Sequence, residues 1–122
     1  MRPMKQLITL LFVALIFAMP GCKKCTIATG TPGCIKDNIE ANQKKSDWYV
    51  GNVEEYKFQG KLVYAFNPDT KVIADGATFI LTAQCDSLCS VGGFGGPSIN
   101  LCNGDNFFQK AVFVRVIWDK YK

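Results

Sequence analysis

Six cysteines and the absence of histidine limit the chemistry open to this chain. Thiols can bind a metal ion, carry out redox reactions, pair as disulfides or accept a lipid. The six lie at Cys22, Cys25, Cys34, Cys85, Cys89 and Cys102. The compartment decides between these chemistries, because disulfides persist only where the surroundings are oxidising.

The first 21 residues have the pattern of an export signal. Arg2 and Lys5 precede an uncharged apolar run over residues 7–19. A membrane-spanning helix needs about 20 apolar residues, so this run is too short for a permanent span. We therefore predict that residues 1–21 direct export and are removed.

The junction after the apolar run predicts lipid attachment. Met19-Pro20-Gly21-Cys22 is similar to a relaxed lipoprotein cleavage box, with a small residue before the cysteine that takes the lipid. We expect Cys22 to carry acyl chains such as palmitate and to become the mature N-terminus, which anchors the protein to a membrane. The residue after the lipid cysteine is Lys23 and not an acidic residue, as in lipoproteins that are sorted to the outer membrane. We therefore expect the protein on the outer membrane, on its periplasmic face. The alternative is an ordinary secretory signal cut near Ala18.

Lipidation of Cys22 leaves five cysteines for the oxidising envelope. Residues 22–33 are polar and rich in turn formers, which predicts a flexible tether. Cys25 in that tether is the expected odd thiol. Four cysteines allow three connectivities. We favour the two pairs in which one disulfide closes a glycine-rich loop, namely Cys34–Cys85 and Cys89–Cys102.

Two other uses of the cysteines, metal binding and redox chemistry, have less support in the sequence. Cys85, Cys89 and Cys102 could offer three thiolates to zinc, but the chain has no histidine to complete a mixed set. Cys22 and Cys25 have the two-residue spacing of redox pairs, but the lipid would consume the first of them. We therefore expect no metal and no other cofactor.

A glycine-rich stretch is the main candidate for a binding loop. Phosphate loops use glycine because it lets backbone amides approach an anion closely. This stretch lacks the Gly-Lys-Ser/Thr ending and a following helix pattern. We expect a disulfide-pinned surface loop whose phenylalanine is either tucked beneath it or offered to a partner. The candidate residues are Gly92, Gly93, Phe94, Gly95 and Gly96.

The remaining polar residues do not make a catalytic set. Glu54 and Glu55 are adjacent on an expected strand, so their carboxylates should point to opposite faces. The serines have no histidine to activate them. One cluster of side-chain oxygens could bind calcium, at Asp86, Asn103, Asp105 and Asn106. The spacing of these residues matches no calcium loop, so we expect them to form turns. We predict that the protein is not an enzyme.

Helical spacing and charge predict one helix over residues 32–45. Pro32 suits its first turn, and acidic residues precede basic ones along it. Ile35 and Ile39 share one face with Cys34, so the helix should pack on a sheet through two isoleucines and a disulfide. We expect the aromatic pairs Trp48-Tyr49 and Phe107-Phe108 to belong to the core.

Alternating apolar and polar residues predict an antiparallel sheet of about five strands. Residues 55–58 and 61–66 alternate on either side of a Gln59-Gly60 turn. A two-residue turn would place Tyr56 opposite Val63, so a bulge or a longer turn would be needed to bring the aromatic residues to one face. Further strands are expected at 72–74, 78–83 and 111–118, the last in the sheet centre because it is nearly all apolar.

Composition supports one folded α+β domain over residues 34–122, with one N-terminal helix on the sheet and disulfides for stability. Hydrophobic residues make up 48% and charged residues 20% of the 122-residue chain, as in globular proteins. The net charge of +4 falls to about +2 once Arg2 and Lys5 are removed, and the basic residues are scattered. No basic stripe suits a nucleic acid.

Several residues between Cys34 and Cys102 carry a family resemblance. They are Cys34-Ile35-Lys36, Ile39, Val53, Tyr56, Gly60-Lys61, Val63-Tyr64, Cys85-Asp86, a later Gly-Gly and Cys102. In these residues the chain resembles small uncharacterised lipoproteins of Bacteroidota. That group has no assigned chemistry, so the resemblance implies no activity.

These observations predict a lipid-anchored binding or structural module of the cell envelope. Its partners would be the membrane, through the lipid on Cys22, and an envelope protein that contacts the glycine-rich loop. The alternative is a small inhibitor of a protease or lysozyme, because a disulfide-pinned loop can enter an active site without being cleaved.

Overall fold

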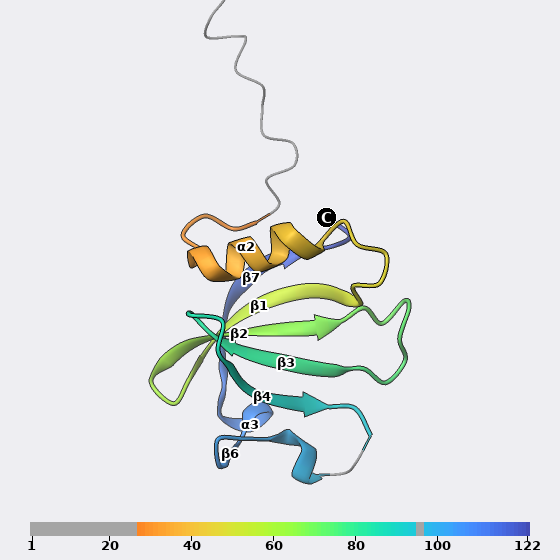
Figure 1. Ribbon diagram of the computed structural model, residues 1–122. Helices are drawn as coiled ribbons and strands as arrows, with labels where there is room; N and C mark the ends of the chain where they lie inside the picture. The colour runs from red at the N-terminus through yellow and green to blue at the C-terminus, as the bar shows by residue number, and fades with distance from the viewer. Residues whose placement is uncertain (1–26, 95–96) are drawn as a thin grey trace, which may run out of the picture.

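The computed structural model describes residues 27–94 and 97–122 (Figure 1). The predicted signal, Cys22, Cys25, Gly95 and Gly96 lie outside the described residues. Helix α2 (Gly33–Asn42) comes first and is followed by strands β1 (Val50–Phe58), β2 (Lys61–Pro68), β3 (Ala77–Thr82) and β4 (Ser87–Gly92). The rest comprises a 3-10 turn η1 (Pro97–Asn100), two short strands β5 (Leu101–Cys102) and β6 (Asp105–Asn106), helix α3 (Phe107–Lys110) and strand β7 (Val112–Asp119).

Five strands form one antiparallel sheet in the order β4-β3-β2-β1-β7. With α2 packed on it and two disulfides, this is the predicted α+β fold. The helix is shorter than predicted. It ends at Asn42, whose side-chain amide donates to the Asn38 carbonyl. Such a bond competes with the helical ladder, so Lys44 and Lys45 lie beyond the helix.

The β1–β2 hairpin has the two-residue turn, with no bulge beside it. Phe58 pairs with Lys61 and Tyr56 with Val63, while Gln59 and Gly60 have φ of 50° and 77°. Positive φ at both positions is the type I′ geometry that suits a tight hairpin. The two-residue turn therefore sets Tyr56 opposite Val63, the aromatic residues of the two strands lie on different faces, and the sheet has a buried core on each face.

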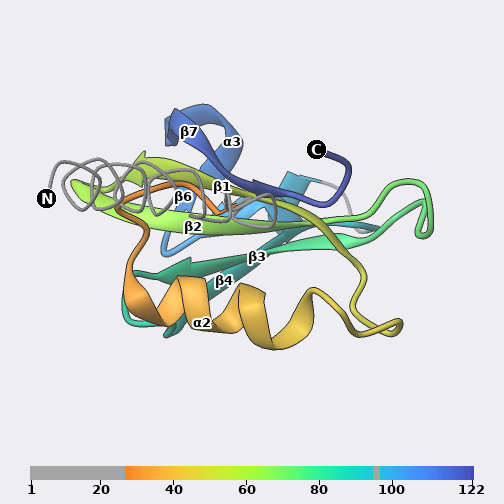
Figure 2. The ribbon, with the colours of Figure 1, turned by 90° about the horizontal axis from the view of Figure 1, so that it is seen from above.

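The two faces have separate coverings, and Figure 2 shows α2 and α3 on opposite sides of the sheet. On the first face, α2 packs over a core of Ile35, Ile39, Val53, Tyr64, Phe66, Ile117 and Trp118. On the second face, α3 and β5 cover a core of Phe58, Val63, Ala65, Ile80, Val91, Cys102 and Phe107. Alternate residues of β1 and β2 therefore serve different cores.

Both favoured disulfides are present. Cys34–Cys85 fixes α2 to the turn between β3 and β4, and Cys89–Cys102 fixes β4 to β5. The first closes a separation of 51 residues and the second one of 13. On the chain-entropy model they contribute about 4 and about 3 kcal/mol of stability. The same pairing rules out a zinc site of Cys85, Cys89 and Cys102.

The strand expected at residues 72–74 does not form. The Asp69 carbonyl accepts from the backbone amides of Val72 and Ile73, and its carboxylate accepts from the Lys71 amide. These local bonds make a turn, and they override the strand preference of the two apolar residues. The fifth strand is instead β4, which the sequence analysis missed.

The last strand lies at an edge of the sheet, so its predicted central position is wrong. Residues 27–29 lie beside part of it, since the Ala28 amide donates to the Ile117 carbonyl at 2.8 Å. Ile27 and Ala28 also pack against the first-face core. The part of the expected tether that the structure describes is therefore bound to the domain.

Candidate binding surfaces

The glycine-rich loop follows β4 at the opposite edge of the sheet from β7. Gly92 and Gly93 have φ of 82° and 84°, a conformation that glycine adopts without strain. Phe94 is 83% exposed, so it is presented to solvent and not tucked beneath the loop. The Cys89–Cys102 disulfide holds the loop's base. An exposed aromatic ring on a pinned loop can contact a partner with little ordering cost.

The Asx cluster forms turns and caps. Asn103 has φ of 47°. Its side-chain Nδ2 donates to Gln59 Oε1, and its backbone carbonyl accepts from Gln59 Nε2, which also donates to Asp105 at 2.8 Å. Asn106 caps α3 by accepting from the Gln109 amide. Within 27–94 and 97–122, no three acidic, cysteine or histidine side chains gather where a metal ion would fit.

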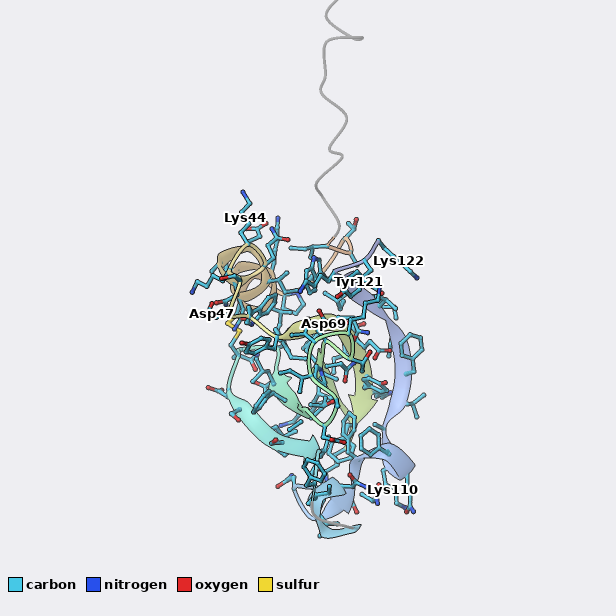
Figure 3. All side chains as sticks on the ribbon, turned by 90° about the vertical axis from the view of Figure 1, so that its right-hand side faces the viewer. Lys44, Asp47, Asp69, Lys110, Tyr121 and Lys122 are labelled. Atoms are coloured by element: carbon cyan, nitrogen blue, oxygen red, sulfur yellow. A yellow bond between two sulfur atoms is a disulfide. The ribbon has the colours of Figure 1, made fainter. Side chains whose placement is uncertain are left out.

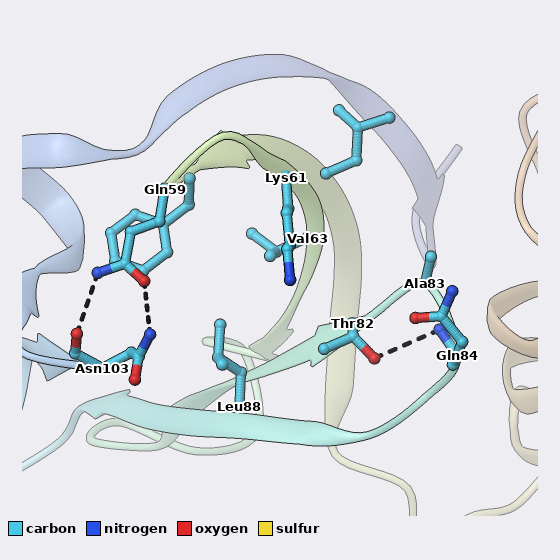
Figure 4. Close-up of a pocket in the computed structure, with 10 residues that line it drawn as sticks. Gln59, Lys61, Val63, Thr82, Ala83, Gln84, Leu88 and Asn103 are labelled. Carbon is cyan, nitrogen blue, oxygen red and sulfur yellow. Dashed lines mark hydrogen bonds between the residues drawn. The ribbon is translucent and has the colours of Figure 1, made fainter.

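An open cavity of about 500 Å³ lies at the β1–β2 turn (Figure 4). Val63, Leu88 and the Phe58 ring supply apolar walls, while the Lys61 ammonium group points between them. The Gln59–Asn103 amide pair closes one end. The described lining residues include no carboxylate and no cysteine, so the cavity has hydrogen-bond donors and one cation but no nucleophile with its base.

A second cavity of about 310 Å³ is lined by apolar and aromatic groups beyond the end of α2. Trp48 forms one wall and packs on Trp118 with ring centroids 5.4 Å apart. Tyr49 and Phe79 on its rim are about half exposed.

Of each aromatic pair predicted to belong to the core, only one residue does. Trp48 packs against the core and Phe107 is buried in it, whereas Tyr49 and Phe108 are exposed.

Glu54 and Glu55 point to opposite faces, as predicted. Glu55 is buried and accepts hydrogen bonds from the Tyr64 hydroxyl at 2.9 Å and from Arg115 Nε at 3.2 Å. Burial, followed by the hydrogen bond to Glu55, raises the pKa of Tyr64 to about 12. Glu54 instead accepts from the Asn67 amide, and its partial burial raises the pKa of its carboxyl. The two carboxylates do not share a site.

Asp69 is the centre of a second buried polar group, seen with Tyr121 in Figure 3. Its carboxylate accepts from the Tyr121 hydroxyl at 2.7 Å and from Lys120 Nζ at 3.0 Å. The hydrogen bond from Tyr121, with help from Lys120 and the Lys71 amide, lowers the pKa of Asp69. A Cβ at Gly51 would lie 2.9 Å from the Asp69 Cα, so only glycine fits beneath this turn. Asp69 joins the C-terminus to the β2–β3 loop, which is a structural role.

The β7 edge is an exposed apolar surface that the sequence did not predict. Val112, Phe113, Val114 and Val116 are each 43–64% exposed, although they lie in the most apolar strand. In the sequence, this strand differs from the others only because polar residues do not alternate with its apolar ones. A buried central strand has the same pattern, so the pattern does not identify an exposed edge. An exposed run of this kind marks an interaction surface.

Together these features define a small disulfide-linked α+β protein with exposed apolar surfaces on both edges of its sheet. Residues 37–120 match the model of a domain of unknown function, DUF6970, and the chain belongs to that family. No curated protein and no solved structure matches the chain. None of the helices in the described ranges is long and apolar enough to cross a membrane.

Proposed function

We propose that the protein is a lipid-anchored, non-enzymatic binding module on the periplasmic face of the bacterial outer membrane. The observation that carries binding is the ring of Phe94, which is 83% exposed on a loop whose base the Cys89–Cys102 disulfide holds. A large aromatic side chain presented to solvent on a fixed loop favours contact with a partner at little ordering cost. The anchoring rests on the Gly21-Cys22 junction after the apolar leader.

The polar groups support binding over catalysis. The buried carboxylates of Glu55 and Asp69 are each occupied by a cation and a tyrosine hydroxyl. Both carboxylates are therefore bonded to neighbouring elements of the fold, which supports a structural role for them over a catalytic one. The exposed apolar residues of β7 provide a second surface on the other edge of the sheet.

The first test is the intact mass of the protein recovered from bacterial membranes, with and without reduction before alkylation. Cleavage before Cys22, added acyl mass and four thiols alkylated only after reduction are expected. A soluble chain without acyl chains would contradict the anchoring.

The binding role is tested by crosslinking in intact cells with two matched variants. Phe94→Ser and Val72→Ser each remove one exposed apolar side chain, but only Phe94 belongs to the pinned loop. If the loop contacts a protein partner, Phe94→Ser removes the crosslinked species and Val72→Ser keeps it. Equal patterns from both variants would contradict a role for the loop.

A second candidate function is inhibition of a protease or lysozyme, which the 83% exposure of Phe94 favours. Purified protein would be tested against a panel of hydrolases. Inhibition lost in Phe94→Ala but kept in Phe108→Ala, an exposed ring outside the loop, would support this candidate. The absence of any inhibition would exclude it for the hydrolases tested.

A further inference from the structure

The free edge of β7 is nearly unpaired in the described structure. One side of the strand bonds to β1. On the other side, the described residues contribute one backbone hydrogen bond, from Ala28 to Ile117. Arg115 also donates from its guanidinium to the Thr29 carbonyl. Residues 112–114 and Val116 are therefore left facing solvent.

The shape of this edge disfavours addition of another strand. The register with β1 shifts twice, which leaves Val114 and Ile117 as extra residues on β7. Such bulges twist an edge and interrupt its ladder, a device that blocks strand pairing. Residues 27–29 obstruct the edge from Arg115 to Ile117. Little regular edge remains for a second copy of the chain.

The number of residues between Cys22 and Ile27 limits how far the proposed anchor can lie from this edge. Ala28 is fixed beside Ile117 by its hydrogen bond. Five peptide units separate Cys22 from Ile27, so the two are at most about 18 Å apart. The exposed residues of β7 extend only about 17 Å from Ile117. A bilayer that holds the acyl chains of Cys22 is therefore within reach of the β7 edge.

Charges around the edge suit an anionic lipid surface. Lys57 pairs across from Val112, Lys110 lies two residues before the strand begins and Lys122 lies three residues after it ends. All three are exposed, and within the described ranges none forms an ion pair. The nearby carboxylates of Glu54 and Asp119 accept hydrogen bonds from Asn67 and from the Tyr121 amide. Lysines beside apolar residues match phosphate headgroups above acyl chains.

We propose that the β7 edge docks onto the phospholipid bilayer to which Cys22 is anchored. Val112, Phe113 and Val114 lie at the boundary between headgroups and acyl chains, and the three lysines contact lipid phosphates. Backbone groups of the edge remain hydrated at this depth, so they do not need the internal partners that the hydrocarbon core requires. This inference rests on the proposed function, because the lipid anchor brings the edge to the membrane.

The test uses the full lipoprotein, produced with its leader and reconstituted in vesicles of phosphatidylethanolamine and phosphatidylglycerol at 3:1. Phe113→Trp places an indole on the β7 edge, and Phe94→Trp is the matched control on the opposite edge. Acyl chains brominated near the headgroup quench indoles that touch them. We expect the additional emission of F113W to fall at least about twofold with brominated lipid, while that of F94W is unchanged. Omitting phosphatidylglycerol should weaken the F113W quenching.

The intact mass of the same sample separates the two levels of the inference. A sample without acyl chains overturns the anchoring and the docking together. An acylated sample in which F113W is not quenched, or in which F113W and F94W are quenched equally, overturns the docking alone. Unquenched F113W in a crosslinked dimer would assign the edge to a second copy, which also overturns the docking.

Discussion

Glu54 and Glu55 are neighbours of the same type, yet their surroundings give them opposite effects on stability. Glu55 is buried with two donors, Tyr64 and Arg115. Glu54 is only partly buried and bonds to a neutral amide, so its charged form loses hydration without a cationic partner. The strand's alternation of faces produces this difference.

The first prediction compares these two carboxylates. Glu55→Ala leaves the Tyr64 hydroxyl and the Arg115 guanidinium without their acceptor, so the free energy of unfolding should fall by about 2 kcal/mol, a value reduced for the partial exposure of Arg115. Glu54→Gln keeps an acceptor for Asn67 and removes a desolvated charge, so it should change stability by less than about 0.5 kcal/mol. Urea denaturation measures both. Equal losses would show that the Glu55 contacts do not stabilise the fold.

The second prediction concerns acid. Because the folded state lowers the pKa of Asp69 below its ordinary 3.8, its contribution to stability is present above that value and is lost as the pH falls through the folded pKa. Asp69→Asn should therefore lower the Tm at about pH 7, and the difference from wild type should shrink towards about pH 2. Circular dichroism melts at the two pH values measure this. Asp47→Asn, at an exposed site, is the control, and a constant Tm difference for Asp69→Asn would refute the role of its charge.

At the scale of elements, β7 combines a core strand and a free edge. Ile117 is 1% exposed and belongs to the first-face core, whereas Val114 is a bulge residue that faces solvent. Strand composition alone does not distinguish these two positions, since both carry β-branched apolar side chains.

The third prediction follows from this difference within one strand. Ile117→Ala should lower the free energy of unfolding by about 3 kcal/mol, because it leaves a cavity in a closed core. Val114→Ala should change it by no more than about 0.5 kcal/mol, because little buried contact is lost. Chemical denaturation of both variants gives the comparison. A large loss at Val114 would mean that the strand's free edge is covered in solution.

At the scale of the whole molecule, β1 and β2 couple the two cores. Each strand supplies alternate residues to the α2 side and to the α3 side. A loss of packing on one face therefore disturbs the strands that support the other. The Cys34–Cys85 disulfide adds a covalent link between α2 and the turn between β3 and β4.

The fourth prediction is that both cores unfold together. Ile39→Ala on the first face and Phe107→Ala on the second should each lower stability by about 3 kcal/mol in a single transition. Tryptophan fluorescence reports the first face through Trp48 and Trp118, and far-ultraviolet circular dichroism reports the whole sheet. Fluorescence and dichroism curves that separate in Phe107→Ala would show independent cores.

Features that depend on neighbours close in the chain can be predicted from the sequence alone. The helix at Ile35 and Ile39, the Gln59-Gly60 turn, the opposite faces of Glu54 and Glu55 and the α+β class follow from periodicity and turn chemistry, and the structure contains them. The favoured cysteine pairing also holds. The lipid on Cys22 and the envelope location remain predictions from the sequence.

Which surfaces are covered depends on contacts between residues far apart in the chain, and these contacts are visible only in the folded protein. The edge position of β7 depends on pairing between strands far apart in the chain, and an apolar strand looks the same in sequence whether neighbours lie on both sides or on one. Likewise, local bonds to Asp69 make a turn where a strand was expected, and Lys120 and Tyr121, about fifty residues later, hold the carboxylate of that turn against the domain. The proposed membrane-facing surface depends on such distant contacts, which local patterns do not encode.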